Sequence, residues 1–148
     1  MTPHVSFLDI ECAVGDVAGL LYSVLYEPYG VARGDNWLHP AEGGVFAVAR
    51  DDAGEVLGVA RLLPAAGDMS RMLRQVSVAP VVQGIGVGRL LVTGLEERAA
   101  AEGTREVWLN ARDSAFGFYR ALGYDFVGEE FVSELTRIPH RRMAKRLP

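Results

Sequence analysis

The sequence contains a single cysteine, Cys12, among its 148 residues. One cysteine cannot form an internal disulfide, which excludes a small disulfide-stapled secreted fold and fits a reducing cytoplasm. One Cys and three scattered His also offer no framework for a metal site. The first residues lack the basic segment and apolar core of a signal peptide, and no apolar run reaches membrane-spanning length. We therefore expect a cytoplasmic protein with no metal and no membrane partner.

Positive charge is in short supply as well. Fifteen Lys and Arg stand against 19 Asp and Glu, which gives a net charge of -4. A general nucleic-acid binder needs a basic face, so no nucleic-acid partner is expected. Apolar residues make up 49% of the chain, which argues against disorder. The length suits one domain over residues 1–148, and no repeat, low-complexity segment or linker interrupts it.

The most informative stretch runs from residue 74 to residue 98. An apolar, β-branched run ends at Val78, and Pro80 then follows, which cannot donate to a sheet ladder. Glycines come next at 84, 86 and 88, and after them Leu91, Leu95 and Ala99 recur at helical spacing. This order predicts a strand, a glycine loop and a helix. Unpaired N–H groups and the dipole at such a helix start favour a bound phosphate.

The spacing of the glycines selects among phosphate loops. A dinucleotide fingerprint would need glycine at the position of Arg89, and a Walker A loop would need Gly-Lys-Ser/Thr at the helix entrance. Neither is present. Gln83, Gly86 and Gly88 fit Q-x-x-G-x-G instead. This pattern resembles the acetyl-CoA pyrophosphate loop of the GNAT superfamily, the acetyl-CoA-dependent N-acetyltransferases.

A second stretch, from Asn110 to Tyr124, strengthens this resemblance. It reads NARDSAFGFYRALGY and is similar to the second GNAT signature, N-x-x-A-x-x-F-Y-x-x-L-G-F, with Tyr124 in place of the final Phe. Two separated motifs in the right order rarely occur by accident. The resemblance covers roughly residues 74–131.

The remaining patterns predict a mixed α/β domain. Expected strands are 5–10, 45–50, 56–63, a strand ending at 78, 106–109, 124–131 and 141–147, and expected helices are 14–29, one from the glycine loop to about 102, and 114–123. The resemblance implies the GNAT fold, which has a mixed, mostly antiparallel central sheet, splayed at the coenzyme site and flanked by helices.

The resemblance also implies acetyl-CoA as co-substrate and assigns residues to it. In GNAT proteins the pantetheine arm lies between the strand before the glycine loop and the next parallel strand. The implied coenzyme contacts are the main chain of Val76, Ser77 and Val78, the loop residues Gln83, Gly84, Ile85, Gly86, Val87, Gly88 and Arg89, and Asn110, Ser114, Ala115, Phe118 and Tyr119. Ser114 is more typical of a helix N-cap than of a ligand.

Tyr119 matches the family's catalytic tyrosine, which protonates the departing coenzyme A thiolate. A phenol with a pKa of about 10 suits that role. A backbone N–H of Val76 or Val78 would stabilise the oxyanion. Many relatives carry a glutamate on the strand before the glycine loop, but residues 70–78 contain no carboxylate. The base is therefore left open between water and Glu27, Asp35, Glu42, Glu129, Glu130 and His140.

We expect acetyl transfer by direct attack of a primary amine of a small molecule. Tyr29, Trp37 and His140 are candidates for the acceptor pocket, although a histidine at a strand start is more often on the surface. Two alternatives remain open: a protein or peptide N-terminal acetyltransferase, and a catalytically idle module that binds acyl-CoA. The sequence leaves the oligomeric state open, a homodimer included.

Overall fold

The computed structural model describes residues 2–9, 16–32, 42–134 and 136–148. The described elements are β1 (His4–Asp9), α1 (Asp16–Leu25), η2 (Glu27–Tyr29), β2 (Val45–Arg50), β3 (Val56–Leu62), β4 (Ser70–Val78), η4 (Pro80–Val82), α2 (Val87–Ala101), β5 (Glu106–Arg112), η5 (Asp113–Ala115), α3 (Phe116–Ala121), β6 (Asp125–Val132) and β7 (Pro139–Arg146). The seven described strands form one sheet in the order β1-β2-β3-β4-β5-β7-β6. Its one parallel pair is β4 with β5, and the other pairs are antiparallel. The predicted mixed, mostly antiparallel sheet is confirmed.

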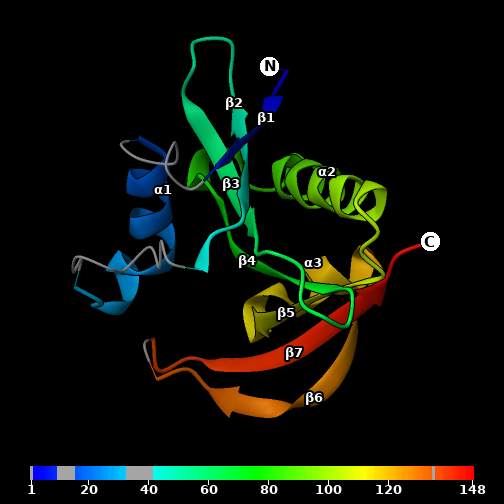
Figure 1. Cartoon of the computed structure of the whole chain (residues 1–148). Helices are drawn as coiled ribbons and strands as arrows, with labels where there is room; N and C mark the ends of the chain where they lie inside the picture. Colours follow the sequence, from blue (N-terminus) through cyan, green and yellow to red (C-terminus); the bar gives the residue numbers. More distant parts are fainter. Residues whose placement is uncertain (1, 10–15, 33–41, 135) are drawn as a thin grey trace.

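Helices cover both faces of the sheet (Figure 1). Because successive strand residues point to opposite faces, β2 and β3 supply two cores. Phe46, Val48 and Val59 pack with α1. The alternate residues of both strands pack with α2 and α3 in a larger core. Within that core Leu91 and Leu95 of α2 are fully buried, as their helical spacing predicts.

The sheet divides between β4 and β5. These strands pair in register only from Ser70 with Glu106 to Met72 with Trp108. Beyond Met72 each strand keeps its other neighbour, since β4 stays paired with β3 and β5 stays paired with β7 as far as Arg112. Figure 1 shows the consequence: β1 to β4 form one half of the molecule, and β5, β7 and β6 leave it at an angle. The predicted splay is therefore present.

A bulge in β4 lies at the start of this divergence. Gln75 has a φ of 56°, and the register between β3 and β4 shifts across it. A buried arginine supports the bulge. Arg61 is fully buried and donates through Nε and Nη2 to the Gly43 carbonyl, at 3.0 and 2.7 Å, and through Nη1 to Gln75 Oε1 at 3.1 Å. Gln75 Nε2 in turn donates to the Tyr26 hydroxyl at 3.3 Å.

Three predictions about local structure need correction. The expected helix 14–29 is α1 followed by the separate 3₁₀ turn η2, because Pro28 has no N–H to continue an α-helix. Strand β5 runs on to Arg112 because β7 pairs with it along its whole length. Ser114 does not cap α3, since its own N–H donates to Asp113 Oδ1 at 2.8 Å and the helix begins two residues later.

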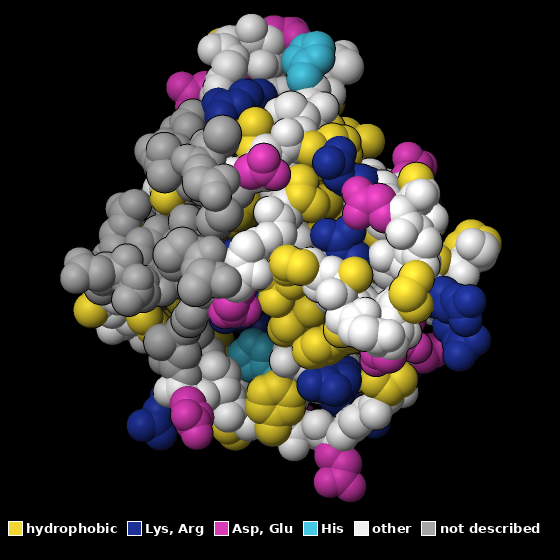
Figure 2. Space-filling view, viewed as in Figure 1, with side chains coloured by type: hydrophobic (Ala, Val, Ile, Leu, Met, Phe, Trp, Pro, Cys, Tyr) yellow, Lys and Arg dark blue, Asp and Glu magenta, His cyan; other side chains and the backbone are white. Residues whose placement is uncertain are grey.

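Two further features complete the fold. Among the described helices, none combines the length and the apolar composition that crossing a membrane would need. On the face drawn in Figure 2, acidic and basic side chains are interspersed with apolar ones. Trp37, a candidate for the acceptor pocket, lies outside the described residues.

Candidate active site

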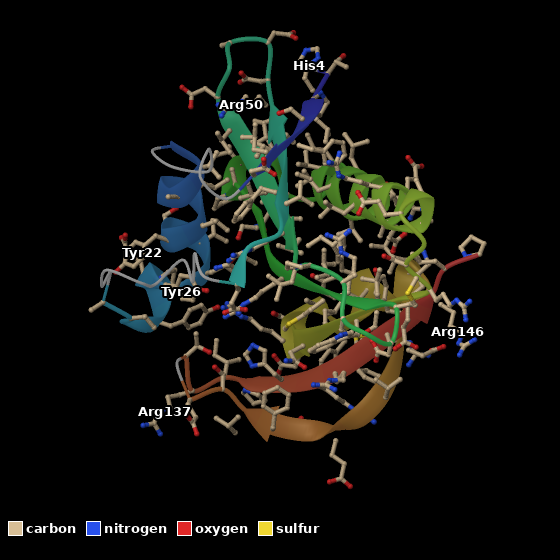
Figure 3. All side chains as sticks on the ribbon, viewed as in Figure 1. His4, Tyr22, Tyr26, Arg50, Arg137 and Arg146 are labelled. Atoms are coloured by element: carbon tan, nitrogen blue, oxygen red, sulfur yellow. The ribbon has the colours of Figure 1, made fainter. Side chains whose placement is uncertain are left out.

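Two cavities meet where β4 and β5 part. The first, which we call the glycine-loop cavity, has a volume of about 630 Å³ and lies between the glycine loop, the end of β4 and α3. The second, the β7-side cavity, has a volume of about 410 Å³ and is bounded by β4, β5 and the start of β7. Figure 3 shows Tyr26 pointing from the end of α1 toward the space between the two halves of the sheet, and Tyr26 lines the β7-side cavity.

Residues common to both cavities mark their junction. They are Leu25, Val76, Arg112, Ala115 and Tyr119. The two cavities therefore adjoin at these residues. Tyr119, the predicted proton donor, is one of these residues.

The glycine loop has the backbone that its sequence requires. Gly84 and Gly86 have φ values of 85° and 92°, which L residues rarely adopt. Gly86 immediately precedes α2, so the free N–H groups of the first helical turn open beside the cavity. Gly88 is closely packed, because a Cβ built there would lie 3.1 Å from Cζ of Phe118. The loop therefore combines a helix start with an approach that side chains do not obstruct.

Most residues assigned to the coenzyme line the glycine-loop cavity. They are Val76, Ser77, Val78, Gln83, Gly84, Gly86, Val87, Gly88, Arg89, Ser114, Ala115, Phe118 and Tyr119. Ile85 is 60% exposed and does not line it. The exposed Gln83 side chain donates through Nε2 to the Val78 carbonyl at 3.2 Å. The side-chain amide of Gln83 thus stabilises the end of β4, and the Gln83 backbone is part of the loop.

Buried polar atoms without partners face this region from both strands. Among the described residues, Ser77 Oγ on β4 and Asn110 Oδ1 on β5 are buried without a hydrogen bond. Unsatisfied buried acceptors are costly, so each suggests a ligand donor. Asn110 lines the β7-side cavity beside the junction. The amide N–H groups of a pantetheine arm would suit its carbonyl oxygen, so the residues present fit the coenzyme that the resemblance implies.

Tyr119 is buried, with 6% of its surface exposed. Burial raises the pKa of its phenol above the ordinary value of 10, and the positive charge of Arg112 opposes that rise. The phenol therefore carries its proton at neutral pH. No described residue forms a hydrogen bond with its hydroxyl, which leaves that proton available to a ligand.

The β7-side cavity has a cationic lining. Its Arg and His side chains are Arg74, Arg112 and His140, and no Asp or Glu lines it among the described residues. Arg74 Nη1 contacts both carboxylate oxygens of Glu42 at 2.6 Å, so its charge is paired. Arg112 Nη2 donates to the Leu25 carbonyl at 3.0 Å, and its guanidinium lies 4.7 Å from the centre of the Tyr29 ring.

His140 lies in the same cavity, stacked on Phe131 with ring centroids 5.8 Å apart. Its Nδ1 is 2.9 Å from the Ile138 carbonyl, and because a carbonyl only accepts, Nδ1 carries the proton. In the neutral imidazole the lone pair is then on Nε2. His140 is thus the one described base candidate that lines this cavity.

Other predicted site residues lie elsewhere. Tyr29 lines the glycine-loop cavity, not the β7-side cavity. Glu42 is engaged by Arg74, while Glu129 and Glu130 are exposed on β6. Among the described residues, no group of three His, Cys, Asp or Glu lies close enough to hold a metal ion.

Sequence reasoning missed three residues of this region. Arg61 stands out as a charge inside an apolar strand, a signal that could have marked it. Arg112 lies inside the second signature at a variable position, so the motif assigns it no role. Thr136 lines the β7-side cavity with its buried Oγ1 unpartnered among the described residues, and nothing in the local pattern predicts that.

The site combines a mixed sheet splayed beside a glycine loop with a cavity on each side of one tyrosine. The family model described as "Acetyltransferase (GNAT) domain" matches residues 33–147. The chain belongs to the GNAT acetyltransferase family.

Relatives and solved structures agree with this family. The uncharacterized protein YyaT of Bacillus subtilis (strain 168) is 32% identical over 75 residues, which are 51% of this chain and 49% of that protein. The chain thus spans about half the length of this curated relative. Escherichia coli ElaA has a TM-score of 0.78 at 20% identity, over 96% of this chain and 99% of its own. An aminoglycoside 6'-N-acetyltransferase complexed with coenzyme A has a TM-score of 0.74 at 18% identity, over 97% of each chain. These two structures share the fold.

Proposed function

We propose that this protein transfers an acetyl group from acetyl-CoA to a primary amine of a small molecule by direct attack. The observation that carries the proposal is the junction of two cavities at Tyr119, with one cavity at a phosphate-type loop and the other of about 410 Å³. That volume suits a small acceptor. The solved neighbour that is named as a coenzyme A complex supports the choice of donor.

The coenzyme would bind in the glycine-loop cavity, with its pantetheine arm reaching past the junction to Asn110 in the β7-side cavity. The loop and the first turn of α2 supply N–H groups for the pyrophosphate. Asn110 Oδ1 accepts from the pantetheine arm. Holding both reactants at one junction turns a bimolecular attack into an effectively unimolecular one. Much of the rate enhancement then comes from positioning.

The bulge in β4 would hold the thioester carbonyl. Gln75 and Val76 have no residue in register opposite them on β3 or β5, which marks them as the bulged pair. The N–H of Val76 is the candidate oxyanion donor, because Val76 lines both cavities. Arg61 holds the bulge in place from behind.

Protons move in two steps. The attacking amine must be neutral, and a cationic cavity lining lowers the pKa of a bound ammonium. Water, or His140 through Nε2, then removes the proton that the amine loses on attack. When the C–S bond breaks, Tyr119 donates its phenolic proton to the thiolate sulfur.

The test is release of free thiol from acetyl-CoA across a panel of amines. We expect release that depends on the amine and saturates with both substrates. An idle acyl-CoA-binding module would instead bind acetyl-CoA in calorimetry and release no thiol with any amine. A preference for peptides with free N-termini over every small amine would favour the N-terminal acetyltransferase alternative.

A further inference from the structure

We infer that the acceptor amine also carries a carboxylate, which Arg112 binds at the junction of the two cavities. The inference rests on the proposed function and names the substrate class of the same site. It starts from the charges in the β7-side cavity. A substrate held there meets Arg112, His140 and the Arg74–Glu42 pair, and it meets no lining carboxylate among the described residues.

Arg112 is the arginine of this cavity whose charge no described carboxylate pairs with. A guanidinium has five N–H donors. One of these is used by the Leu25 carbonyl, and the Tyr29 ring covers one face of the group. No described Asp or Glu forms an ion pair with Arg112. A half-buried guanidinium in this state fits the planar, two-oxygen geometry of a carboxylate.

Arg112 has cross-strand neighbours on the two strands that follow β5 in the sheet. Arg112 of β5 pairs with His140 of β7, and His140 pairs with Phe131 of β6. Side chains directly opposite in a sheet share a face, so the three present one surface to the cavity. The ring of Phe131 and the stacked imidazole form a wall beside the guanidinium. A ligand anchored on Arg112 would lie along this wall.

A second donor lies in the same cavity. Thr136 is 9% exposed, and its Oγ1 is buried without a hydrogen-bond partner among the described residues. A hydroxyl can donate to a carboxylate oxygen and so avoid the cost of remaining unsatisfied. Arg112 and Thr136 thus line the same cavity with a charged and a neutral donor.

The position of Arg112 limits the length of the acceptor. Arg112 lines both cavities, as Tyr119 and Val76 do. Its charge also acts on the phenol of Tyr119, because it opposes the rise in that pKa. An anion on Arg112 therefore lies close to the reacting groups. The amine and the carboxylate of the acceptor are expected to be separated by only a few bonds, as in an α-, β- or γ-amino acid.

The experiment compares α-, β- and γ-amino acids with their carboxamides, which keep the shape and lose the charge. Values of kcat/KM are corrected for the neutral fraction of each amine. At least one amino acid should exceed its carboxamide by about 10- to 100-fold, the range expected for a hydrogen bond to a charged group. A diamine, which places a second ammonium beside Arg112, should be the poorest acceptor. An aminoalkylphosphonate that outperforms the matched amino acid would overturn the choice of carboxylate.

Variants assign the preference to a residue. In Arg112→Gln the ratio of amino acid to carboxamide should fall toward one, and in Thr136→Val it should fall by a smaller factor. Arg142→Gln is the matched control, because Arg142 lies on the neighbouring strand over the Trp108 ring and lines neither cavity. Its ratio should equal that of the unmodified protein. An unchanged ratio in a folded Arg112→Gln protein would contradict the inference.

A binding measurement separates this inference from the proposed function. An N-acetylated amino acid is titrated into the protein with coenzyme A present. Binding that Arg112→Gln weakens at least tenfold supports the anion site even if no amine is acetylated, and in that case only the proposed function falls. Thiol release with carboxamides or diamines favoured over amino acids overturns this inference and keeps the function. If the protein shows no turnover with any amine and no binding of the N-acetylated amino acid, both the inference and the proposed function are overturned.

Discussion

Tyr119 and Tyr124 are both buried phenols, with ring centroids 5.7 Å apart. Their hydroxyls have different surroundings. The Tyr124 hydroxyl donates to Glu96 Oε2 at 2.7 Å, and Lys145 holds the other oxygen of that carboxylate at 3.0 Å. The Tyr119 hydroxyl has no partner among the described residues. The first arrangement joins α2 to the end of the sheet, and the second leaves a proton for a ligand.

The two tyrosines therefore form a matched pair for mutation. Tyr119→Phe should lower turnover about 100-fold, the usual contribution of a general acid, with little change in acetyl-CoA affinity. Tyr124→Phe should keep turnover and lower the free energy of unfolding by about 1–3 kcal/mol, because a buried carboxylate oxygen loses its donor. Steady-state kinetics and urea unfolding measure the two effects. Full turnover in Tyr119→Phe, under conditions where chemistry limits the rate, would assign the proton to water.

For single residues, the sequence predicted which residues belong to the site better than it predicted what surrounds them. Tyr119, Asn110 and the loop glycines follow from short motifs whose spacing is local. The missed Arg112 and Thr136 come from segments that meet only after β7 folds back onto β5. No spacing along the chain expresses that contact, so their shared cavity could not be predicted.

The glycine loop and the β4 bulge are the elements that shape the site. Gly86 has a φ of 92°, and a Cβ built there would meet no atom within 4 Å. Gly86→Val should therefore add no internal clash, but it should strain the backbone and place a branched side chain where the phosphates approach. We expect coenzyme affinity to fall strongly while the fold is retained, as measured by calorimetry and circular dichroism.

Gly54 supplies the control for that variant. It lies in the turn between β2 and β3 with a φ of 86°, also with open space around its Cβ position. Gly54→Val should carry a similar backbone strain without touching the loop. Loss of affinity in Gly86→Val alone identifies the phosphate site, and equal affinity in both folded variants would show that the loop assignment is wrong.

A substitution of Arg61 tests whether the bulge in β4 contributes to stability and turnover. Arg61→Met would leave the Gly43 carbonyl and Gln75 Oε1 without this donor. We expect a loss of about 3 kcal/mol in the free energy of unfolding, since buried acceptors lose a charged partner. Turnover per folded molecule should fall as well, because the bulge positions the main chain of Val76. Arg98→Met, at a surface pair with Glu102, should change neither quantity appreciably. Unaltered turnover in folded Arg61→Met would separate the bulge from catalysis.

Element boundaries show where local patterns stop being sufficient. The β2–β3 hairpin and α2 were predicted closely, because turn glycines and helical spacing are properties of neighbouring residues. The bulge at Gln75 was not predicted, since it depends on the register with β3 and on a buried arginine from that strand. The end of β5 depended in the same way on β7.

At the scale of the whole molecule, we propose that proton removal from the amine depends on the cavity as a whole and not on one carboxylate. The pH profile of kcat/KM should rise toward the pKa of the acceptor amine and should shift when the acceptor is changed. Single substitutions of Glu27, Asp35, Glu42, Glu129, Glu130 and His140 should each leave measurable activity. A rate loss of about 1,000-fold from any one of them, near 4 kcal/mol, with folding and both affinities preserved, would identify a dedicated base.

The central claim is that both substrates meet at the junction of the two cavities and that the acetyl group passes directly between them. Mass spectrometry of a reaction with labelled acetyl-CoA and a small amino acid tests it most directly. The account predicts one N-acetylated amine for each coenzyme A released, no acetylated protein at any time, and a rate about 100-fold lower in Tyr119→Phe. Acetyl-CoA that binds at the loop yet never yields an N-acetylated amine, or an acetyl-protein that forms and decays at the rate of turnover, would contradict it.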